Sequence, residues 1–181
     1  MKLIITGATG FIGKALINHL INNEIIPTII VRKSSLLTAN LKMCNIIESD
    51  LKDFDVSLLH SFDENDQLIH LAWGGLPNYD AQHHLKEELP IQVDFLTKVI
   101  STGVKNIFVT GTCFEYGLKE NGIHEDSDLS PINAYGIAKV KLNKELIKLQ
   151  KNTNFNLIWA RLFYLYGHDQ SKNSLIGQLE E

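Results

Sequence analysis

Short apolar runs alternate along the chain with longer stretches in which apolar residues recur every three or four positions. Short runs rich in β-branched side chains predict buried strands, and the longer periodic stretches predict amphipathic helices. The predicted strands cover residues 2–6, 27–32, 45–48, 67–71, 106–110 and 156–161. The predicted helices cover residues 13–22, 81–88, 91–102 and 134–151. Strands that alternate with helices in this way predict an α/β fold, a doubly wound parallel sheet covered on both faces.

The organisation of the chain is simple. It has 181 residues, no internal repeat and no linker-like segment, which is enough for one domain with a substantial core. Pro90 stands between the second and third predicted helices. Because proline lacks the N–H that a helix interior uses, we expect Pro90 to kink or split one long helix.

Three glycines follow the first predicted strand and lead into the first predicted helix. Gly7 lets the chain turn sharply out of the strand, Gly10 leaves room for a pyrophosphate, and Gly13 lets the helix pack closely on the sheet. The N–H groups and positive dipole end of that helix would then face the phosphates. This favours a dinucleotide site over a glycine-rich turn without a ligand. The neighbouring candidates for cofactor binding are Thr9, Phe11 and Ile12.

The residues directly after each predicted strand carry most of the functional information. In a doubly wound sheet the ligand lies beyond the carboxyl ends of the strands, near the point where the strand order reverses. The segments that should meet there are residues 6–13, 32–33, 50–51, 71–73, 110–112 and 162–164.

Composition and charge narrow the classes of partner. The net charge of −4 and the absence of a basic stripe argue against nucleic acid and anionic membranes as partners. Cys44 and Cys113 lie far apart, and the seven histidines form no zinc motif, so we expect no metal site. No stretch has the length of a membrane-spanning segment and no signal peptide is evident. The expected location is the cytoplasm.

Tyr135 and Lys139 lie four residues apart within a predicted helix, which puts both on one face. A phenol is a poor acid–base catalyst at neutral pH unless its anion is stabilised. A nearby ammonium and an oxidised nicotinamide would both lower its pKa. The alternative is a surface tyrosine above the stem of a lysine.

The chain resembles the extended branch of the short-chain dehydrogenase/reductase superfamily, which contains NAD-dependent nucleotide-sugar epimerases, dehydratases and reductases. The likeness rests on Thr6-Gly7-Ala8-Thr9-Gly10-Phe11-Ile12-Gly13 and on Pro131 followed by Tyr135-Gly136-Ile137-Ala138-Lys139. The resemblance implies a Rossmann-like NAD(P)-binding fold. It also implies that Tyr135 and Lys139 are catalytic residues that contact the cofactor as well.

The segment from Phe108 to Gly117 resembles the part of the family that supplies a catalytic hydroxyl. The resemblance assigns that role to Thr112 and makes Thr110 a neighbour of the cofactor. The alternative is a strand end rich in threonine. The family's 4,6-dehydratases carry Asp-Glu directly after the catalytic threonine, whereas this chain has Cys113-Phe114. Dehydration is therefore disfavoured, and epimerisation or carbonyl reduction remains.

The resemblance also assigns the cofactor contacts. Arg32 and Lys33 end the second predicted strand, where two cations suit a 2′-phosphate, so NADP(H) is favoured and NAD(H) remains an alternative, as does a solvated basic loop. The adenine contacts would be Asp50 and Leu51. The remaining predicted contacts are Leu71, Ala72, Trp73 and Phe163.

The resemblance covers residues 1–167, the predicted dinucleotide domain, while residues 168–181 look like the start of a truncated C-terminal substrate region. A shortened chain, an incomplete reading frame and a compact relative all remain open. The leading hypothesis is an NAD(P)-dependent epimerase or 4-keto reductase with a nucleotide-sugar substrate, and it permits a homodimer. The rival is a non-catalytic dinucleotide-binding module. These residues alone should bind dinucleotide, turn over substrate poorly and expose apolar surface.

Overall fold

The computed structural model describes residues 1–34, 37–120 and 122–167. The strands are β1 (Leu3–Thr6), β2 (Thr28–Val31), β3 (Asn45–Glu48), β4 (Gln67–His70), β5 (Asn106–Thr112) and β6 (Asn156–Leu162). The α-helices are α1 (Phe11–Asn22), α2 (Leu89–Ser101) and α3 (Ala134–Gln150), and the shorter helical segments are η2 (Leu41–Met43), η3 (Val56–Leu59), η4 (His84–Glu88) and η5 (Cys113–Glu115). Residues 168–181, expected to start a C-terminal substrate region, lie outside the described residues.

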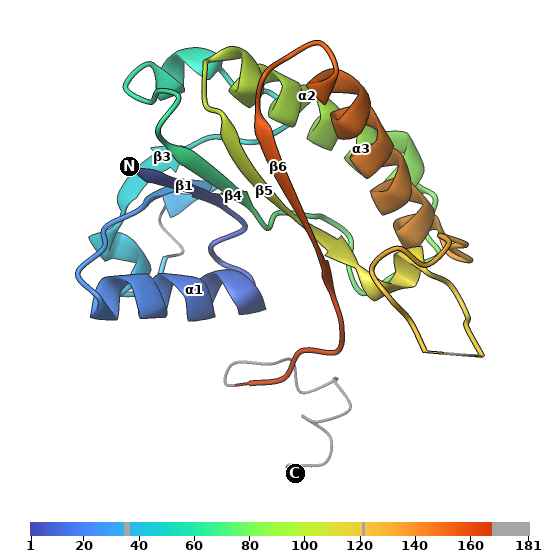
Figure 1. Cartoon of the computed structure of the whole chain (residues 1–181). Helices are drawn as coiled ribbons and strands as arrows, with labels where there is room; N and C mark the ends of the chain where they lie inside the picture. The colour runs from blue at the N-terminus through green and yellow to red at the C-terminus, as the bar shows by residue number, and fades with distance from the viewer. Residues whose placement is uncertain (35–36, 121, 168–181) are drawn as a thin grey trace.

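All six strands pair in parallel, in the order β3-β2-β1-β4-β5-β6. Helix α1 covers one face of this sheet, and α2 and α3 cover the other (Figure 1). The predicted α/β fold with a doubly wound parallel sheet is therefore confirmed, and each predicted strand is present within one or two residues of its expected bounds. The order reverses between β1 and β4, which places the switch point at their carboxyl ends.

Two apolar cores hold the helices to the sheet. The larger core lies under α2 and α3 and includes Ile4 and Phe95, both with no exposed surface. The smaller core lies under α1 and includes Ile5 and Ile17. Neighbouring residues of β1 point to opposite faces, so Ile4 and Ile5 supply one core each. A strand buried on both faces reads as a continuous apolar run, which is why the apolar pattern located β1 and β2 so closely.

Pro90 does not split the helical region in two, which was one of the two outcomes predicted for it. Residues 84–88 form a π-helical segment, η4, that continues directly into α2, with Pro90 in the first turn of α2. The missing N–H of proline is tolerated in the first turn of a helix. The π-helix η4 ends at Glu88 and the α-helix α2 begins at Leu89, so the helical stretch continues through Pro90 without a break. The predicted helix at residues 81–88 is thus shorter and of another type.

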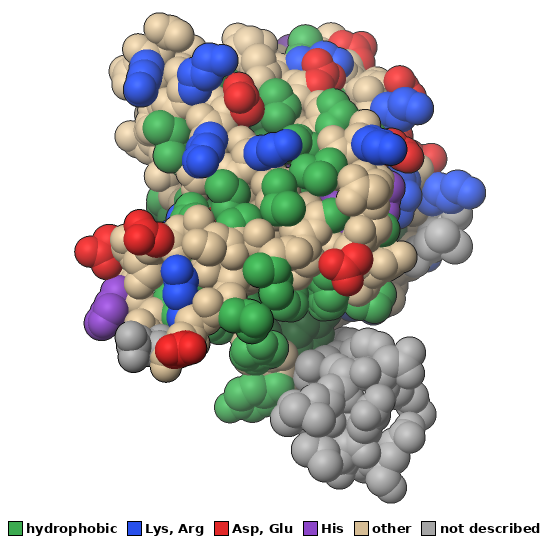
Figure 2. Space-filling view, turned by 90° about the vertical axis from the view of Figure 1, so that its right-hand side faces the viewer, with side chains coloured by type: hydrophobic (Ala, Val, Ile, Leu, Met, Phe, Trp, Pro, Cys, Tyr) green, Lys and Arg blue, Asp and Glu red, His purple; other side chains and the backbone are tan. Residues whose placement is uncertain are grey.

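Large apolar side chains reach the surface in several places. In the space-filling view they gather below the middle of the face turned to the viewer (Figure 2). Across the described residues the most exposed include Tyr164 at 88% and Leu118 at 84%. Phe163 and Tyr166, which follow β6, are also exposed, so the expected apolar surface is present. Within the described residues, no helix has the length and apolar character needed to cross a membrane.

Candidate active site

A cleft of about 260 Å³ opens at the carboxyl edge of the sheet, at the switch point between β1 and β4. Segments that follow four different strands line it, and the start of the α2 region closes one side. The lining residues are Gly7, Ala8, Thr9, Gly10, Ile30, Val31, Arg32, Ser49, Asp50, Leu51, Leu71, Ala72, Trp73, Gly74, Glu88, Ile91 and Gln92. The cleft thus lies where the fold predicts a ligand.

The glycine turn after β1 has the geometry of a phosphate cradle. Gly7 has a φ of 74°, and a Cβ there would lie 2.7 Å from the backbone nitrogen of Ala72. A Cβ on Gly13 would lie 2.1 Å from the carbonyl oxygen of Gly7, so only glycine lets α1 come this close to the turn. Gly10 lines the cleft and precedes the first N–H groups of α1, which have no partner within the helix. These residues fit the pyrophosphate of a dinucleotide.

Charged residues of both signs lie where β2 and β3 end. Arg32 lines the cleft, whereas Lys33 does not. Val31 pairs with Glu48 of β3, and the Glu48 carboxylate accepts hydrogen bonds from the Ser34 hydroxyl and from the Ser34 backbone N–H, the latter at 2.8 Å. The Ser34 hydroxyl bond holds the pKa of Glu48 below its usual value. The Ser34 hydroxyl, next to the predicted phosphate contacts Arg32 and Lys33, therefore already donates to an anionic carboxylate.

A series of hydrogen bonds through the side chains of Thr6, His70 and Gln92 supports the loop after β4. The Ala72 N–H donates to the Thr6 hydroxyl, which bonds Nδ1 of His70 at 2.8 Å. His70 Nε2 lies 2.6 Å from the Gln92 side-chain oxygen. Because that oxygen only accepts, His70 carries its proton on Nε2. Burial lowers the pKa of His70 to about 3, so the ring is neutral and serves a structural purpose here.

At its other end, this series of hydrogen bonds reaches Glu88, which binds the backbone of the same loop. The amide nitrogen of the Gln92 side chain donates to the Glu88 carboxylate at 3.0 Å, and the backbone N–H of Gly74 donates to the same oxygen at 3.0 Å. A Cβ on Gly74 would come within 2.3 Å of that carboxylate. Glu88 and Gln92 were not predicted as site residues. They lie far from the glycine turn in sequence, and their polar side chains on a helix gave no signal of their own.

Helix α3 presents Tyr135 and Lys139 at the carboxyl end of β5. Asn133 caps the helix through a bond from the Gly136 N–H at 2.8 Å, so α3 starts one residue before Tyr135. The Lys139 ammonium donates to the Thr110 carbonyl oxygen at 2.8 Å and lies 5.8 Å from the centre of the Tyr135 ring. The side chain is 1% exposed, and burial lowers the pKa of Lys139 to about 7. The predicted pair thus shares one face, deep in the protein.

Tyr135 is enclosed by aromatic rings. The ring of Trp73 meets it edge-on at 5.6 Å, and those of His84 and Tyr79 lie 5.4 and 5.8 Å away. Burial raises the pKa of Tyr135, as do the charges of Tyr79 and Glu115, while a hydrogen bond with Thr112 lowers it. The sequence predicted that a nearby ammonium and an oxidised nicotinamide together lower this pKa, a prediction that concerns the site with dinucleotide bound.

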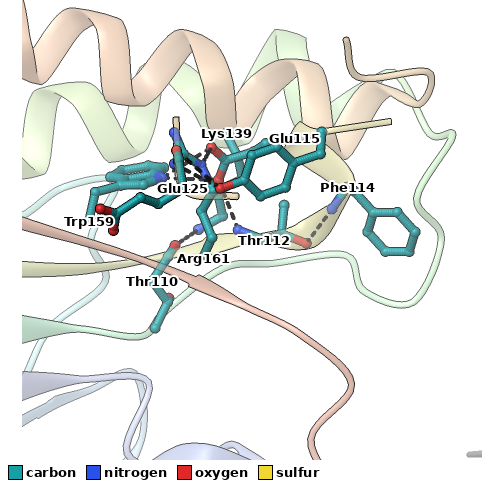
Figure 3. Close-up of polar contacts among 9 residues, drawn as sticks. Thr110, Thr112, Phe114, Glu115, Glu125, Lys139, Trp159 and Arg161 are labelled. Atoms are coloured by element: carbon teal, nitrogen blue, oxygen red, sulfur yellow. Dashed lines mark hydrogen bonds and ion pairs between the residues drawn. The ribbon is translucent and has the colours of Figure 1, made fainter. Parts of the chain in front are cut away.

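Thr112 is held in place by a buried carboxylate. The Thr112 N–H donates to Glu115 at 2.8 Å, and the Thr112 hydroxyl accepts from the Phe114 N–H at 3.3 Å. Glu115 is 0% exposed and also accepts from the Trp159 indole at 3.0 Å and from Arg161 Nε at 2.8 Å. Figure 3 shows these side chains converging from η5, β6 and the end of β5. The Glu115–Arg161 pair was not predicted.

The structure brings together only part of the predicted cofactor set. Gly7, Thr9, Gly10, Arg32, Asp50, Leu51, Leu71, Ala72 and Trp73 line the cleft, whereas Phe11, Ile12, Gly13, Lys33, Thr110, Tyr135, Lys139 and Phe163 do not. Phe163 stacks on Tyr116 at 6.2 Å instead, beside Arg161. Thr110, Tyr135 and Lys139 lie next to the cleft, on the far side of Trp73.

The arrangement combines a cleft that has a glycine cradle with a buried phenol next to Trp73, one of the residues that line the cleft. Within the described ranges, no group of three or more His, Cys, Asp or Glu side chains is arranged to hold a metal ion. The chemistry these residues offer is acid–base chemistry at a hydroxyl or carbonyl oxygen, together with orientation by the Thr112 hydroxyl.

Comparison with known proteins finds relatives whose names are those of sugar-nucleotide enzymes. It is 31% identical over 184 residues to dTDP-6-deoxy-L-talose 4-dehydrogenase (NAD(+)) of Aggregatibacter actinomycetemcomitans, an alignment that covers 99% of this chain and 67% of that protein. It is 27% identical over 180 residues to ADP-L-glycero-D-manno-heptose-6-epimerase of Brachyspira hyodysenteriae, covering 93% of this chain and 56% of that protein.

A solved structure agrees with these relatives. The NAD-dependent NDP-hexosamine 5,6-dehydratase TunA superposes with a TM-score of 0.80 at 25% identity, over 98% of this chain and 59% of that protein. The chain therefore spans roughly three fifths of the length of the proteins it matches. A model of the NAD dependent epimerase/dehydratase family matches residues 3–179. The chain belongs to the NAD-dependent epimerase/dehydratase family, within the extended short-chain dehydrogenase/reductase superfamily.

Proposed function

We propose that this chain forms the dinucleotide-binding and catalytic part of an NAD(P)-dependent 4-keto reductase or 4-epimerase acting on a nucleotide-activated sugar. One observation carries the proposal. Tyr135, Lys139 and Thr112 meet at the carboxyl end of β5, directly beside a cleft with a glycine cradle. The two relatives compared above, a dehydrogenase and an epimerase, act on nucleotide-linked sugars by name, which supports the substrate class.

The proposed roles are those that the family resemblance implies, and the positions of the side chains support them. Tyr135 passes a proton to or from the sugar oxygen, and Thr112 orients that oxygen through its hydroxyl. Lys139 binds the ribose of the dinucleotide and, as an ammonium, stabilises the tyrosine anion. The nicotinamide, when bound, donates or accepts the hydride. Reduction and epimerisation use these same residues, so the products formed from a 4-keto sugar and from a hexose distinguish the two.

Dehydration of the 4,6 type is disfavoured by the residues after Thr112. Cys113 and Phe114 carry no carboxyl group, and burial raises the pKa of the Cys113 thiol. Glu115 is buried against Arg161 and the Thr112 N–H, so its carboxylate is not available to a sugar. The 5,6-dehydratase activity named for the structural neighbour concerns that protein, and we do not propose it for this chain.

Lys139→Met tests the proposal against the rival of a non-catalytic binding module. Removing the ammonium takes away the ribose contact and the partner of the tyrosine anion, so turnover of the full-length protein should fall at least a hundred-fold. Dinucleotide affinity should fall about ten-fold, as for one lost charged hydrogen bond. The readouts are absorbance at 340 nm for the reduction of a 4-keto sugar, chromatography of the products for the epimerisation of dTDP- and UDP-sugars, and calorimetric titration.

Lys141→Met is the matched control, because Lys141 is an exposed residue of the same helix two positions on. It should leave both quantities within about two-fold. If the parent protein binds dinucleotide but converts none of the dTDP- and UDP-sugars, the non-catalytic module is the better description of the protein. If Lys139→Met and Lys141→Met change turnover and dinucleotide affinity equally, Lys139 has no role in the site.

Arg32 sets the preference between the two dinucleotides in our proposal. Arg32→Ala should weaken NADP binding about ten- to a hundred-fold through the loss of one charge-assisted phosphate contact, and should barely change NAD binding. Glu48→Gln should act in the opposite direction, because it removes a negative charge beside Ser34. Titration of both dinucleotides measures this. The name of one relative contains NAD(+). If the parent binds NAD more tightly than NADP, and Arg32→Ala weakens the binding of both equally, the preference for NADP is rejected.

A further inference from the structure

The cleft ends before it reaches the catalytic residues. Trp73 and Gly74 form its boundary on the side of β5, and Thr112, Tyr135 and Lys139 are not among its lining residues. The lining residues thus include the predicted adenine contacts Asp50 and Leu51 and the glycine cradle, and none of the three catalytic candidates. The Lys139 ammonium, which would bind the second ribose, is almost fully covered.

The indole of Trp73 is the side chain that covers Lys139 from the cleft. The ammonium lies 4.1 Å from the centre of the indole ring, which is a close cation–π contact. The same indole meets the ring of Tyr135 edge-on. Trp73 thus separates the dinucleotide cleft from both members of the catalytic pair.

Three contacts fix the indole in this position. Its N–H donates to Nδ1 of His84 at 3.0 Å, so His84 carries its proton on Nε2, which donates to the Asn78 carbonyl oxygen at 2.8 Å. The other two are those with Lys139 and Tyr135. The backbone beside the indole consists of Gly74 and Gly75, and Gly75 has a φ of 80°, a conformation that other residues rarely adopt. The loop is therefore shaped to hold Trp73, whose indole is kept in place by the bond to His84, the cation–π contact with Lys139 and the edge-on contact with Tyr135.

We propose that Trp73 is a positioning residue that gates the catalytic pair: the nicotinamide half of a dinucleotide reaches Lys139 only after the indole has left it. The inference rests on the proposed function, because it takes the dinucleotide as the ligand of the cleft. Displacing the indole weakens dinucleotide binding by the strength of the contacts that the indole loses with His84, Lys139 and Tyr135. ADP ends at the pyrophosphate and does not extend to Lys139. Its binding therefore does not require the indole of Trp73 to move.

Trp73→Leu tests the gate by comparing two ligands on one protein. The variant should bind NAD or NADP about ten-fold more tightly than the parent, because no cation–π contact has to be broken. Its affinity for ADP should stay within about two-fold. Trp73→Phe keeps a ring over Lys139 but removes the N–H to His84, so it should fall between the parent and Trp73→Leu. Calorimetric titration gives the affinities, and thermal unfolding checks that each variant is folded.

Fluorescence provides a second readout in the parent, which has two tryptophans, Trp73 and Trp159. Dinucleotide should change the emission and its quenching by acrylamide, ADP should not, and Trp73→Phe should abolish the change. Unchanged or weaker dinucleotide binding by Trp73→Leu overturns the gate and makes the indole a fixed wall of the site. In that case the proposed function stands if the parent binds dinucleotide. A parent that binds neither NAD nor NADP overturns both.

Discussion

Tyr135→Phe should lower turnover of a nucleotide sugar by about 10²- to 10⁴-fold and leave dinucleotide affinity nearly unchanged. This is the range that a positioned acid–base group contributes to catalysis. The substitution removes one hydroxyl and keeps the ring, whose neighbours include Trp73 and Tyr79. Packing around α3 should therefore survive, and the lost activity reports the proton transfer.

The surroundings of Tyr135 make the size of this effect informative. Burial raises the pKa of its phenol, and only the bond with Thr112 acts against it. Catalysis at neutral pH therefore needs a cation close to the phenol, and Lys139 is the cation of this site. If Trp73 leaves Lys139 when dinucleotide binds, the ammonium becomes free to approach both the ribose and Tyr135.

The measurement is steady-state turnover of the full-length protein and its variant, with titration of NAD and NADP. Tyr166→Phe is the control, since it removes the same hydroxyl from a side chain that is 78% exposed. It should retain the activity of the parent. A Tyr135→Phe variant as active as Tyr166→Phe would show that the proton passes through another group.

The sheet and the cradle could be predicted because their signals are local. A strand buried on both faces must be apolar along its length, so β1 and β2 stand out in the sequence. In the phosphate turn, Gly7 adopts a positive φ, and Gly13 must be glycine because Gly7 and Ala8 lie a few positions away. Tyr135 and Lys139 could be placed on one face because four residues make about one turn of a helix.

The features that the sequence did not reveal depend on contacts between distant positions. Glu115 and Arg161 are 46 residues apart and meet only because β5 and β6 pair in register. Likewise, Trp73 reaches Lys139 across the sheet edge, and Glu88 holds Gly74 from another element. No spacing rule links such residues. The raised pKa of Tyr135 belongs to the same class, since it follows from the rings packed around it.

Glu115→Ala should lower the free energy of unfolding by about 3–5 kcal/mol. Removing one partner of a buried ion pair leaves the other charge without compensation, and that usually costs this much. Here it also strips the acceptor from the Thr112 N–H and from the Trp159 indole, two donors that lie in or near the core. Urea unfolding of parent and variant measures the difference.

Glu145→Ala is the matched control for this prediction. Glu145 also faces a cation, Lys148, but at 3.9 Å and with both side chains about half exposed or more. An exposed pair of this kind contributes less than about 1 kcal/mol. If Glu115→Ala costs no more than Glu145→Ala, the buried carboxylate is not the element that fixes η5 and β6.

A double substitution separates the ion pair from the other bonds of Glu115. Arg161→Met together with Glu115→Gln leaves no uncompensated charge, while the glutamine oxygen can still accept from the Thr112 N–H. The double variant should therefore be more stable than Glu115→Ala, although it lacks both charges. Because the side chain at position 115 also holds the backbone of Thr112, the double variant should be more active as well as more stable than Glu115→Ala. Recovery of stability alone would mean that the carboxylate supports the fold without positioning the catalytic hydroxyl.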